Sequence, residues 1–355
     1  MIECRSSVGP DYLSNFCQKV TKLRVPISGA LEFTYRCNLK CVHCYVGSAR
    51  YRQSSARDEM DTHTVFRVLD EASDAGCLYL LITGGEPLLR PDFGEVYEHA
   101  KKNGMVVTVF TNGTLINRKV LDLFADLPPQ VVEISLYGAT QETYERVTGV
   151  PGSFNSCING IEALLGRGIR LALKTILMSV NIHEFYEIER IAKSYDVKFR
   201  FDPAISPRFD GDLSPLSLRV PVEEALEKEL SDETRCKEWK NFLSRFGAVT
   251  LKDRLYTCSA GVTNFHIGPE GFLMPCLMVR HLRYDLLSGS FVDGWEKMAH
   301  LSERRAEPGR RCHNCSEVIL CGYCPGFFLL EKGDENLLSD YLCDLGRARY
   351  SALNK

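Results

Sequence analysis

Short apolar runs alternate with amphipathic stretches from residue 30 to about residue 205. Six runs have the length and composition of strands, and we predict strands at 31–35, 78–83, 106–110, 131–137, 171–178 and 197–202. Helical periodicity between them predicts helices near 61–76, 92–103, 117–126, 140–147, 154–168 and 183–195. Near-continuous apolar strands that alternate with helices are typical of the α/β class, with a parallel sheet covered by helices. Six such units predict a partial (β/α)6 TIM-like barrel or a doubly wound sheet.

The pattern changes after residue 205. The segment 206–221 is rich in Pro, Ser and Gly and predicts a linker, and a charged helix is expected over 222–246. A β-hairpin is expected at 264–276, turning at Gly-Pro-Glu-Gly. The predicted parts are an N-terminal extension 1–29, a barrel 30–215, a linker with a bridging helix 216–250, and a small α+β domain 251–355.

Composition is that of a globular protein, with 355 residues, 45% hydrophobic and 25% charged. The net charge of −3 provides no basic field, which argues against nucleic acid or an anionic membrane as the main partner. No basic start followed by an apolar run marks a secretory signal, and the longest apolar runs have only strand length. We therefore expect a cytoplasmic protein that does not enter a membrane.

The chain has fifteen cysteines, and a reducing cytosol argues against a disulfide framework, so their clustered spacings indicate metal or redox sites. Cys37, Cys41 and Cys44 form a C-x3-C-x2-C motif directly after the first predicted strand. A second group lies in the C-terminal third: Cys258, Cys276, Cys312, Cys315, Cys321, Cys324 and Cys343. Its two C-x2-C pairs each place two sulfurs on one tight turn. Spacing alone leaves structural zinc or, for the first trio, unrelated core cysteines as alternatives.

Other motifs follow the next predicted strands. Gly-Gly-Glu-Pro at 84–87 follows the second, Thr-Asn-Gly-Thr at 111–114 the third, and Ile-Ser-Leu-Tyr-Gly at 134–138 lies at the fourth. With C-x3-C-x2-C, these motifs resemble the radical S-adenosylmethionine (SAM) enzymes. The second cysteine group resembles their C-terminal SPASM extension, in which Gly271 fills the glycine position of C-x(9–15)-G-x4-C. Here two residues separate Cys321 from Cys324 where that family has three, so the geometry at that site is expected to differ.

The resemblance implies a [4Fe–4S] cluster held by Cys37, Cys41 and Cys44, with SAM chelating the remaining iron. Reduction would cleave SAM to methionine and a 5′-deoxyadenosyl radical. Gly84 and Gly85 would let the backbone approach the methionine amino group, and Glu86 would accept its hydrogen bond. The expected cofactor-binding residues are Tyr45, Gly84, Gly85, Glu86, Pro87, Thr111, Asn112, Ser135 and Lys174.

One or two auxiliary iron–sulfur clusters are also implied. The resemblance assigns Cys258, Cys276 and Cys324 to the nearer cluster. The farther cluster would have four thiolates: Cys312, Cys315, Cys321 and Cys343. Three visible ligands at the nearer site leave an open iron, a smaller cluster or a non-cysteine ligand as alternatives.

The implied activity is that of a maturase that modifies a ribosomally made precursor peptide by thioether formation, crosslinking, epimerisation or excision. A flavodoxin or ferredoxin type reductant would supply electrons. The residues before the first strand are too few for a peptide-binding domain, so a separate leader-binding protein or the C-terminal region is expected to recognise the leader.

Two alternatives compete with this interpretation. A sulfatase maturase would carry an acidic base directly after Cys276, where this chain has Leu277. Asp202 and Asp210 are candidate acids or bases for another reaction, although solvent-facing loop carboxylates would occur in the same sequence context. A non-enzymatic zinc or iron–sulfur module would explain the C-terminal cysteines but not the Gly-Gly-Glu-Pro motif.

Overall fold

The computed structural model describes residues 10–47, 59–246 and 253–354. Nine strands form one sheet in the order β6-β5-β4-β3-β2-β1-β7-β8-β9. The strands are β1 Ser28–Glu32, β2 Tyr79–Thr83, β3 Val106–Thr111, β4 Val131–Ser135, β5 Leu171–Ile176, β6 Lys198–Asp202, β7 Asn264–Ile267, β8 Phe272–Met274 and β9 Tyr284–Asp285. All pairs from β6 to β7 are parallel, and only the last two are antiparallel.

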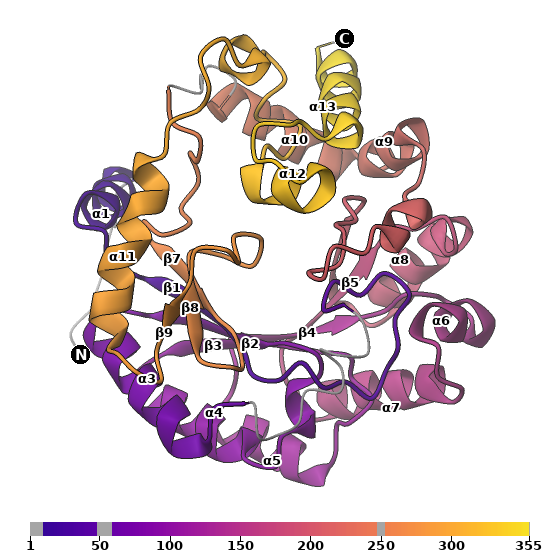
Figure 1. The fold of residues 1–355 in the computed structure, drawn as a ribbon. Coiled ribbons are helices and arrows are strands. Elements are labelled where there is room, and N and C mark those ends of the chain that lie inside the picture. Colours follow the sequence, from indigo (N-terminus) through magenta and orange to yellow (C-terminus); the bar gives the residue numbers. More distant parts are fainter. Residues whose placement is uncertain (1–9, 48–58, 247–252, 355) are drawn as a thin grey trace.

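Helices surround this curved sheet, as Figure 1 shows. Those between the barrel strands are α3 Thr62–Asp74, η2 Pro87–Leu89, α4 Phe93–Lys102, α5 Arg118–Asp126, α6 Gln141–Thr148, α7 Ser153–Gly166, η3 Ile182–Glu184 and α8 Phe185–Ser194. The others are α1 Pro10–Lys22, η4 Ser214–Leu218, α9 Val222–Leu230, α10 Glu233–Phe246, α11 Phe291–Glu303, η5 Arg311–Asn314, α12 Pro325–Lys332 and α13 Asp340–Leu353. Within the described ranges, no helix is both long and apolar enough to cross a membrane.

The two faces of the sheet differ in chemistry because side chains alternate along a strand. Val107, Val109, Val132 and Ile134 are fully buried and belong to the large core under the outer helices. Residues one position away point to the inner face, among them the half-buried Glu133. The barrel interior is therefore partly polar, which a substrate site requires.

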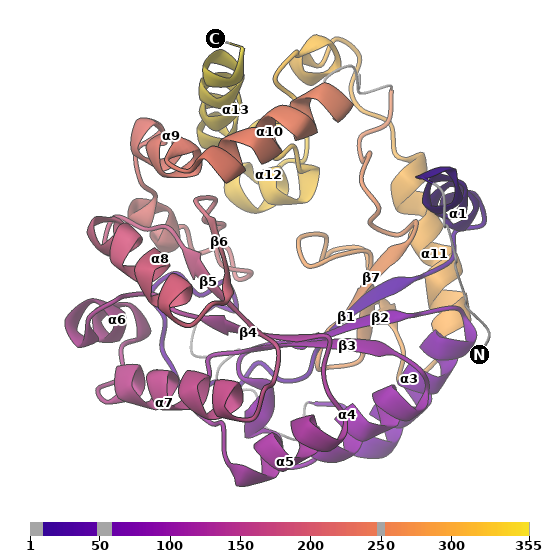
Figure 2. The ribbon, with the colours of Figure 1, turned by 180° about the vertical axis from the view of Figure 1, so that it is seen from behind.

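The C-terminal hairpin extends the barrel sheet on the β1 side. β7 pairs in parallel with β1, from Ser28 opposite Asn264 to Leu31 opposite Ile267. Gly29 makes this possible, because a Cβ there would lie 2.1 Å from the Phe265 ring. Figure 2, seen from behind, shows β7 beside β1 and α9, α10, α12 and α13 on the far side of the ring.

A buried ion pair fixes the last helix. Arg349 in α13 donates from Nε to Glu229 of α9 at 2.8 Å, and from Nη1 to the Leu320 carbonyl at 2.6 Å. Both side chains are at least 90% buried. Removing one partner of such a pair leaves an uncompensated buried charge, so this contact holds the cysteine-rich segment against α9.

Most predicted elements are confirmed, with ends shifted by up to three residues. The sequential order from β6 to β1 rules out the doubly wound alternative, which needs a switch point in the strand order. The single helix expected at 222–246 is wrong: α9 and α10 are separate, because Asp232 accepts hydrogen bonds from the backbone of Thr234 and Arg235 and starts a new helix. The expected linker at 206–221 contains the short helix η4, and the hairpin is confirmed.

Candidate active site

The three cysteines of the first motif lie on the loop that follows β1, at the carboxyl ends of the barrel strands. Backbone hydrogen bonds fix this loop: the amide of Lys40 donates to Thr148 at 2.7 Å and that of Val42 to Val147 at 3.0 Å. Arg208 donates to the carbonyl of Val42 at 3.3 Å. All three cysteines are half-buried, so the loop presents them partly open at one end of the barrel.

These thiols share one neighbourhood. Burial, and then the nearby thiols of all three cysteines, raise the pKa of the Tyr137 hydroxyl. Burial also raises the pKa of the Cys37 thiol to about 12, so iron coordination would be needed to hold it as a thiolate. Within the described ranges, no three Cys, His, Asp or Glu side chains converge as ligands of a single ion. Three thiols on one loop would leave one iron of a four-iron cluster without a protein ligand, which is the donor set expected where a cosubstrate completes the site.

Gly84 and Gly85 bring the loop after β2 into contact with the loop after β1. A Cβ on Gly84 would lie 2.3 Å from the Thr34 carbonyl oxygen, and one on Gly85 would lie 2.3 Å from that of Arg36. Gly84 also has a φ of +127°, which side chains rarely adopt. The amides of Gly85 and Glu86 donate to the carbonyls of Thr34 and Arg36 at 2.7 and 2.9 Å. The chain's own backbone therefore accounts for both glycines, and their approach to the methionine amine stays a prediction.

The Glu86 carboxylate joins the loops after β2 and β3. It is fully buried and accepts hydrogen bonds from the Thr111 hydroxyl at 2.8 Å, the Asn112 amide at 2.7 Å and the Leu88 amide at 3.1 Å. Burial raises its pKa to about 7 despite these donors. Pro87 occupies the first turn of η2, which Glu86 caps. Glu86 thus has a structural role here, and its bond to the SAM amine stays a prediction.

The Asn112 side chain reaches back to the cysteine loop. Its Nδ2 donates to Asn38 at 2.9 Å and lies 3.8 Å from the Cys37 sulfur, while its Oδ1 accepts from the Thr114 hydroxyl at 2.7 Å. The Thr111 hydroxyl likewise donates a hydrogen bond to Glu86 and accepts one from the Gly113 amide. Both side chains are explained by contacts within the protein, so ribose binding by Thr111 and Asn112 stays a prediction.

Ser135 and Lys174 are paired across β4 and β5 on the inner face. Ser135 hydrogen-bonds to the Tyr137 hydroxyl beside the cysteines. The Lys174 ammonium lies 3.9 Å from Glu133 and 3.0 Å from the centroid of the Phe110 ring. The structure therefore brings both predicted residues into the barrel interior, and binding of the cosubstrate by Ser135 and Lys174 stays a prediction.

Lys174 also gives a test of the barrel interior. Burial lowers its pKa to about 7, whereas lysine in an unfolded chain has a pKa near about 10.4. Between these values the unfolded state binds more protons, so the free energy of unfolding rises with pH above about 7. Urea unfolding at about pH 7, 8 and 9 measures this rise. We expect the rise to be smaller in Lys174→Met than in the wild type. It should equal that of the wild type in the control Lys198→Met, because Lys198 is exposed. Equal slopes in all three proteins would contradict the placement of Lys174.

Tyr45 packs against the chain rather than presenting a free face. Its ring lies 4.9 Å from that of Phe209, whose amide donates to the Tyr45 carbonyl at 2.9 Å. The Arg280 guanidinium also lies near Phe209, 4.2 Å from the ring centroid. Adenine contact by Tyr45 stays a prediction, and the observed role is to join the cysteine loop to the segment after β6.

The C-terminal cysteines separate into the two sets expected from the resemblance. Cys276 is close enough to Cys324 and Cys258 for each thiol to perturb its pKa, after the dominant effect of burial. The other four line a single small cavity: Cys312, Cys315, Cys321 and Cys343. Four convergent thiols suit a cluster with a full set of protein ligands, whereas three suit one with an additional ligand.

Asp202 and Asp210 lie apart from these groups. Both are exposed, and each accepts a hydrogen bond from a backbone amide two residues ahead, at 2.8 Å from Ala204 and at 3.3 Å from Asp212. This is the pattern of turn-forming aspartates. Neither lines the cavity described next, and their acid–base role stays a prediction.

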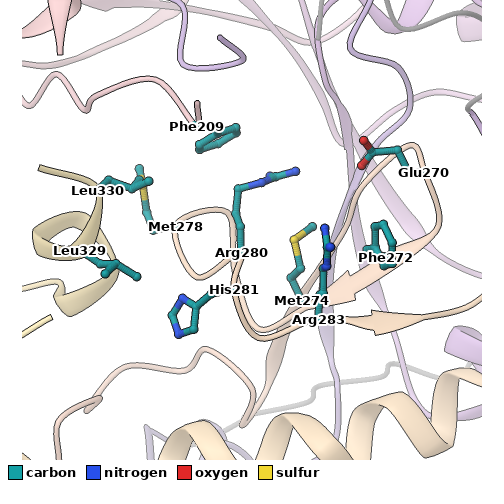
Figure 3. Close-up of a pocket in the computed structure, with 10 residues that line it drawn as sticks. All are labelled: Phe209, Glu270, Phe272, Met274, Met278, Arg280, His281, Arg283, Leu329 and Leu330. Atoms are coloured by element: carbon teal, nitrogen blue, oxygen red, sulfur yellow. The ribbon is translucent and has the colours of Figure 1, made fainter. Parts of the chain in front are cut away.

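A cavity of about 410 Å³ lies between the barrel and the C-terminal segment. Figure 3 shows its lining residues, which come from the segment after β6, the β7–β8 hairpin, the loop after Cys276, and α12. Tyr35 connects it to the cysteine loop, since the Tyr35 hydroxyl hydrogen-bonds to both Glu270 and Arg280. The cavity therefore borders the site where the first motif would hold its cluster.

Sequence reasoning missed several residues of this site. Tyr137, Phe209 and Arg280 touch the cysteine loop or its neighbours but belong to segments far apart in the sequence. Two signals were available: Tyr137 stands within the Ile-Ser-Leu-Tyr-Gly motif, and Arg280 follows Cys276 by four residues. Neither signal identifies which residue is contacted, because the contacts depend on how the fold brings these segments together, as in the pairing of β1 with β7.

Comparison with known proteins agrees with this arrangement. The model of the radical SAM superfamily matches residues 31–192. The AdoMet-dependent heme synthase of Methanosarcina barkeri is 32% identical over 86% of this chain and 93% of its own. The mycofactocin maturase MftC of Mycobacterium ulcerans is 29% identical, covering 84% of this chain and 82% of the relative.

A solved structure extends the similarity to the fold. Streptococcus suis SuiB bound to its precursor peptide SuiA matches with a TM-score of 0.69 and 17% identity, over 97% of this chain and 83% of SuiB. This match covers the C-terminal segment as well as the barrel. The chain therefore belongs to the radical SAM superfamily, whose enzymes use a [4Fe–4S] cluster and S-adenosylmethionine.

Proposed function

We propose that this enzyme is a maturase that modifies a ribosomally made precursor peptide at an unactivated C–H bond. The observation that carries the proposal is the cavity beside the cysteine loop, which has both apolar and charged lining residues and is built jointly by the barrel and the C-terminal segment. Two similarities support it: the relative MftC is named a maturase, and SuiB, which shares the fold, binds a precursor peptide. When bound, the cluster and SAM supply the 5′-deoxyadenosyl radical that removes a hydrogen atom.

The chain's own residues would hold and orient the reactants. Cys37, Cys41 and Cys44 would be the cluster ligands, and Asn112, which donates toward the Cys37 sulfur at 3.8 Å, would stabilise the thiolate. Lys174 and Ser135 would face SAM from the inner wall. The bonds between the glycine loop and the cysteine loop keep these groups in a fixed geometry, which is what radical chemistry requires of the protein.

The C-terminal segment would hold auxiliary clusters. Cys258, Cys276 and Cys324 would bind one, and the cavity lined by four thiols would bind another. In this proposal the chain consists of the extension 1–29, the barrel 30–215, the connecting segment 216–250 and the auxiliary-cluster region 251–355. A flavodoxin or ferredoxin type protein would supply electrons, and either a separate protein or the auxiliary-cluster region would bind the leader. Tight binding of the precursor to this chain alone would rule out the separate leader-binding protein.

Tetrapyrrole chemistry is the second candidate. The heme synthase relative has the higher identity of the two relatives described, and this chain covers 93% of it. The cavity also carries cationic side chains, which suit the carboxylates of a porphyrin.

One experiment separates the two candidates. Anaerobically reconstituted enzyme is incubated with SAM, dithionite and either iron coproporphyrin III or the peptides encoded by short reading frames beside the gene. Mass spectrometry then follows each substrate, with SAM omitted as the control. We expect one peptide to change mass and the porphyrin to remain intact. A changed porphyrin with unchanged peptides would replace the peptide substrate by a tetrapyrrole.

A further inference from the structure

The cavity beside the cysteine loop has an apolar wall. It is formed by Phe209, Phe272, Met274, Met278, Leu329 and Leu330. Methionine side chains are flexible and polarisable, so such a wall adapts to apolar groups of different shape. At about 410 Å³ the cavity is large enough for a side chain with part of its backbone.

The remaining lining residues are polar, and most of their charge is already compensated. Arg280 donates to Glu32 at 3.1 Å and to the Tyr35 hydroxyl, and Glu32 is fully buried. His281 lies 3.2 Å from Glu335. Arg280 and His281 therefore serve internal contacts that hold the loop after Cys276 in place.

Arg283 differs from its neighbours. It is exposed, and its guanidinium lies 4.3 Å from the centroid of the Phe272 ring. Among residues 10–47, 59–246 and 253–354, no ion pair joins it to a carboxylate. The one carboxylate that lines the cavity is Glu270; burial raises its pKa, while the nearby guanidiniums of Arg280 and Arg283 act to lower it. The cavity therefore presents an exposed guanidinium at Arg283 that, within the described ranges, has no carboxylate in direct ion-pair contact.

We propose that Arg283 selects the substrate by binding a carboxylate in the peptide segment that enters the cavity. The inference rests on the proposed function, since it takes the ligand to be a peptide. The Arg283 guanidinium lies against the Phe272 ring, and a guanidinium offers paired N–H donors that match the two oxygens of a carboxylate. The apolar residue next to this carboxylate packs on Met274 and Met278. The carboxylate comes from an Asp or Glu side chain or from the peptide's C-terminus.

The test is a binding selection, so it does not depend on turnover. Random peptides linked to their messenger RNA are selected on immobilised, anaerobically reconstituted enzyme with SAM present and reductant absent. Their C-termini are blocked by the link, so this arm reports side chains alone. We expect Asp or Glu to be enriched at one position with the wild type and to lose that enrichment with Arg283→Gln. Arg118→Gln is the matched control, because Arg118 is 89% exposed on the outer helix α5.

The second arm of the test distinguishes the C-terminal carboxylate of a peptide from the carboxylate of an Asp or Glu side chain. Selected peptides are synthesised as free acids and as amides, each with and without Glu→Gln or Asp→Asn. We expect removal of the recognised carboxylate to weaken binding about tenfold in the wild type and less than about twofold in Arg283→Gln. Peptides that bind with no carboxylate preference, or with one that survives Arg283→Gln, would overturn the inference and leave the peptide substrate standing. If no peptide is enriched, the inference about Arg283 fails, and the mass measurement on modified peptides decides the proposed peptide substrate separately.

Discussion

Replacing Cys37, Cys41 and Cys44 together by alanine is expected to abolish formation of 5′-deoxyadenosine from SAM and to remove about four irons per chain. The three thiols lie on one loop with Tyr137 beside all of them, so the triple substitution removes every thiol of the C-x3-C-x2-C motif from this site. Two auxiliary four-iron clusters would bring the wild type to about twelve irons, and a two-iron auxiliary cluster would bring it to about ten.

The measurement combines iron and sulfide analysis with chromatography of the nucleoside after addition of dithionite. Cys17/Cys236→Ala is the control, because these two cysteines lie outside both patterned groups and neither is buried. It should keep the iron content and the nucleoside of the wild type. Zinc in place of sulfide, or unchanged nucleoside in the triple variant, would contradict the assignment of the first motif.

Gly85→Ala is expected to destabilise the protein by about 3 kcal/mol and to weaken SAM binding. The new Cβ would lie 2.3 Å from the Arg36 carbonyl oxygen and 2.6 Å from that of Tyr35. Because both atoms belong to the backbone, no side-chain rotation relieves the clash, and the loop after β2 must move away from the cysteine loop. That movement would stretch the hydrogen bond from the Gly85 amide to the Thr34 carbonyl.

Guanidinium unfolding of the anaerobic protein measures the stability, and equilibrium dialysis measures SAM binding. Gly166→Ala is the matched control, since a Cβ at Gly166 would meet nothing within 4 Å and alanine favours the helix α7. It should be at least as stable as the wild type. If Gly85→Ala unfolds at the same guanidinium concentration as the control, the loop after β2 and the cysteine loop are farther apart than described.

The sequence predicts the barrel well because strand-length apolar runs alternate regularly with stretches of helical periodicity. Apolar runs such as 106–110 become strands whose alternate residues are fully buried under the outer helices. The break between α9 and α10 was not predictable from periodicity, since the hydrophobic pattern continues across it. There the side chain of Asp232 competes for the backbone amides and ends one helix by starting another.

The candidate site is predicted in part. Spacing alone identified the two cysteine groups, and the resemblance, not the spacing, divided the second group into the sets that the structure brings together. For Glu86, Thr111 and Asn112, the sequence predicted contacts with the cosubstrate, whereas the structure shows them bonded to one another. The ends of adjacent parallel strands meet at one edge, so polar residues there contact each other, which a linear motif does not reveal.

The cavity was not predicted at all. Phe209, Glu270 and Arg280 are brought together by the pairing of β7 with β1 and by the path of the segment after β6. Such contacts depend on tertiary geometry and leave no periodic signal. Arg283 illustrates this, since only the structure shows that its neighbour Arg280 is compensated by Glu32.

The central claim is that the radical formed by this enzyme takes its hydrogen atom from a peptide. It is tested by incubating the holoenzyme with SAM, reductant and a precursor peptide made from perdeuterated amino acids, and then measuring the mass of the 5′-deoxyadenosine. The account predicts nucleoside that carries one deuterium, with a matching loss from the modified peptide. Nucleoside free of deuterium, formed while the peptide is modified, would contradict it.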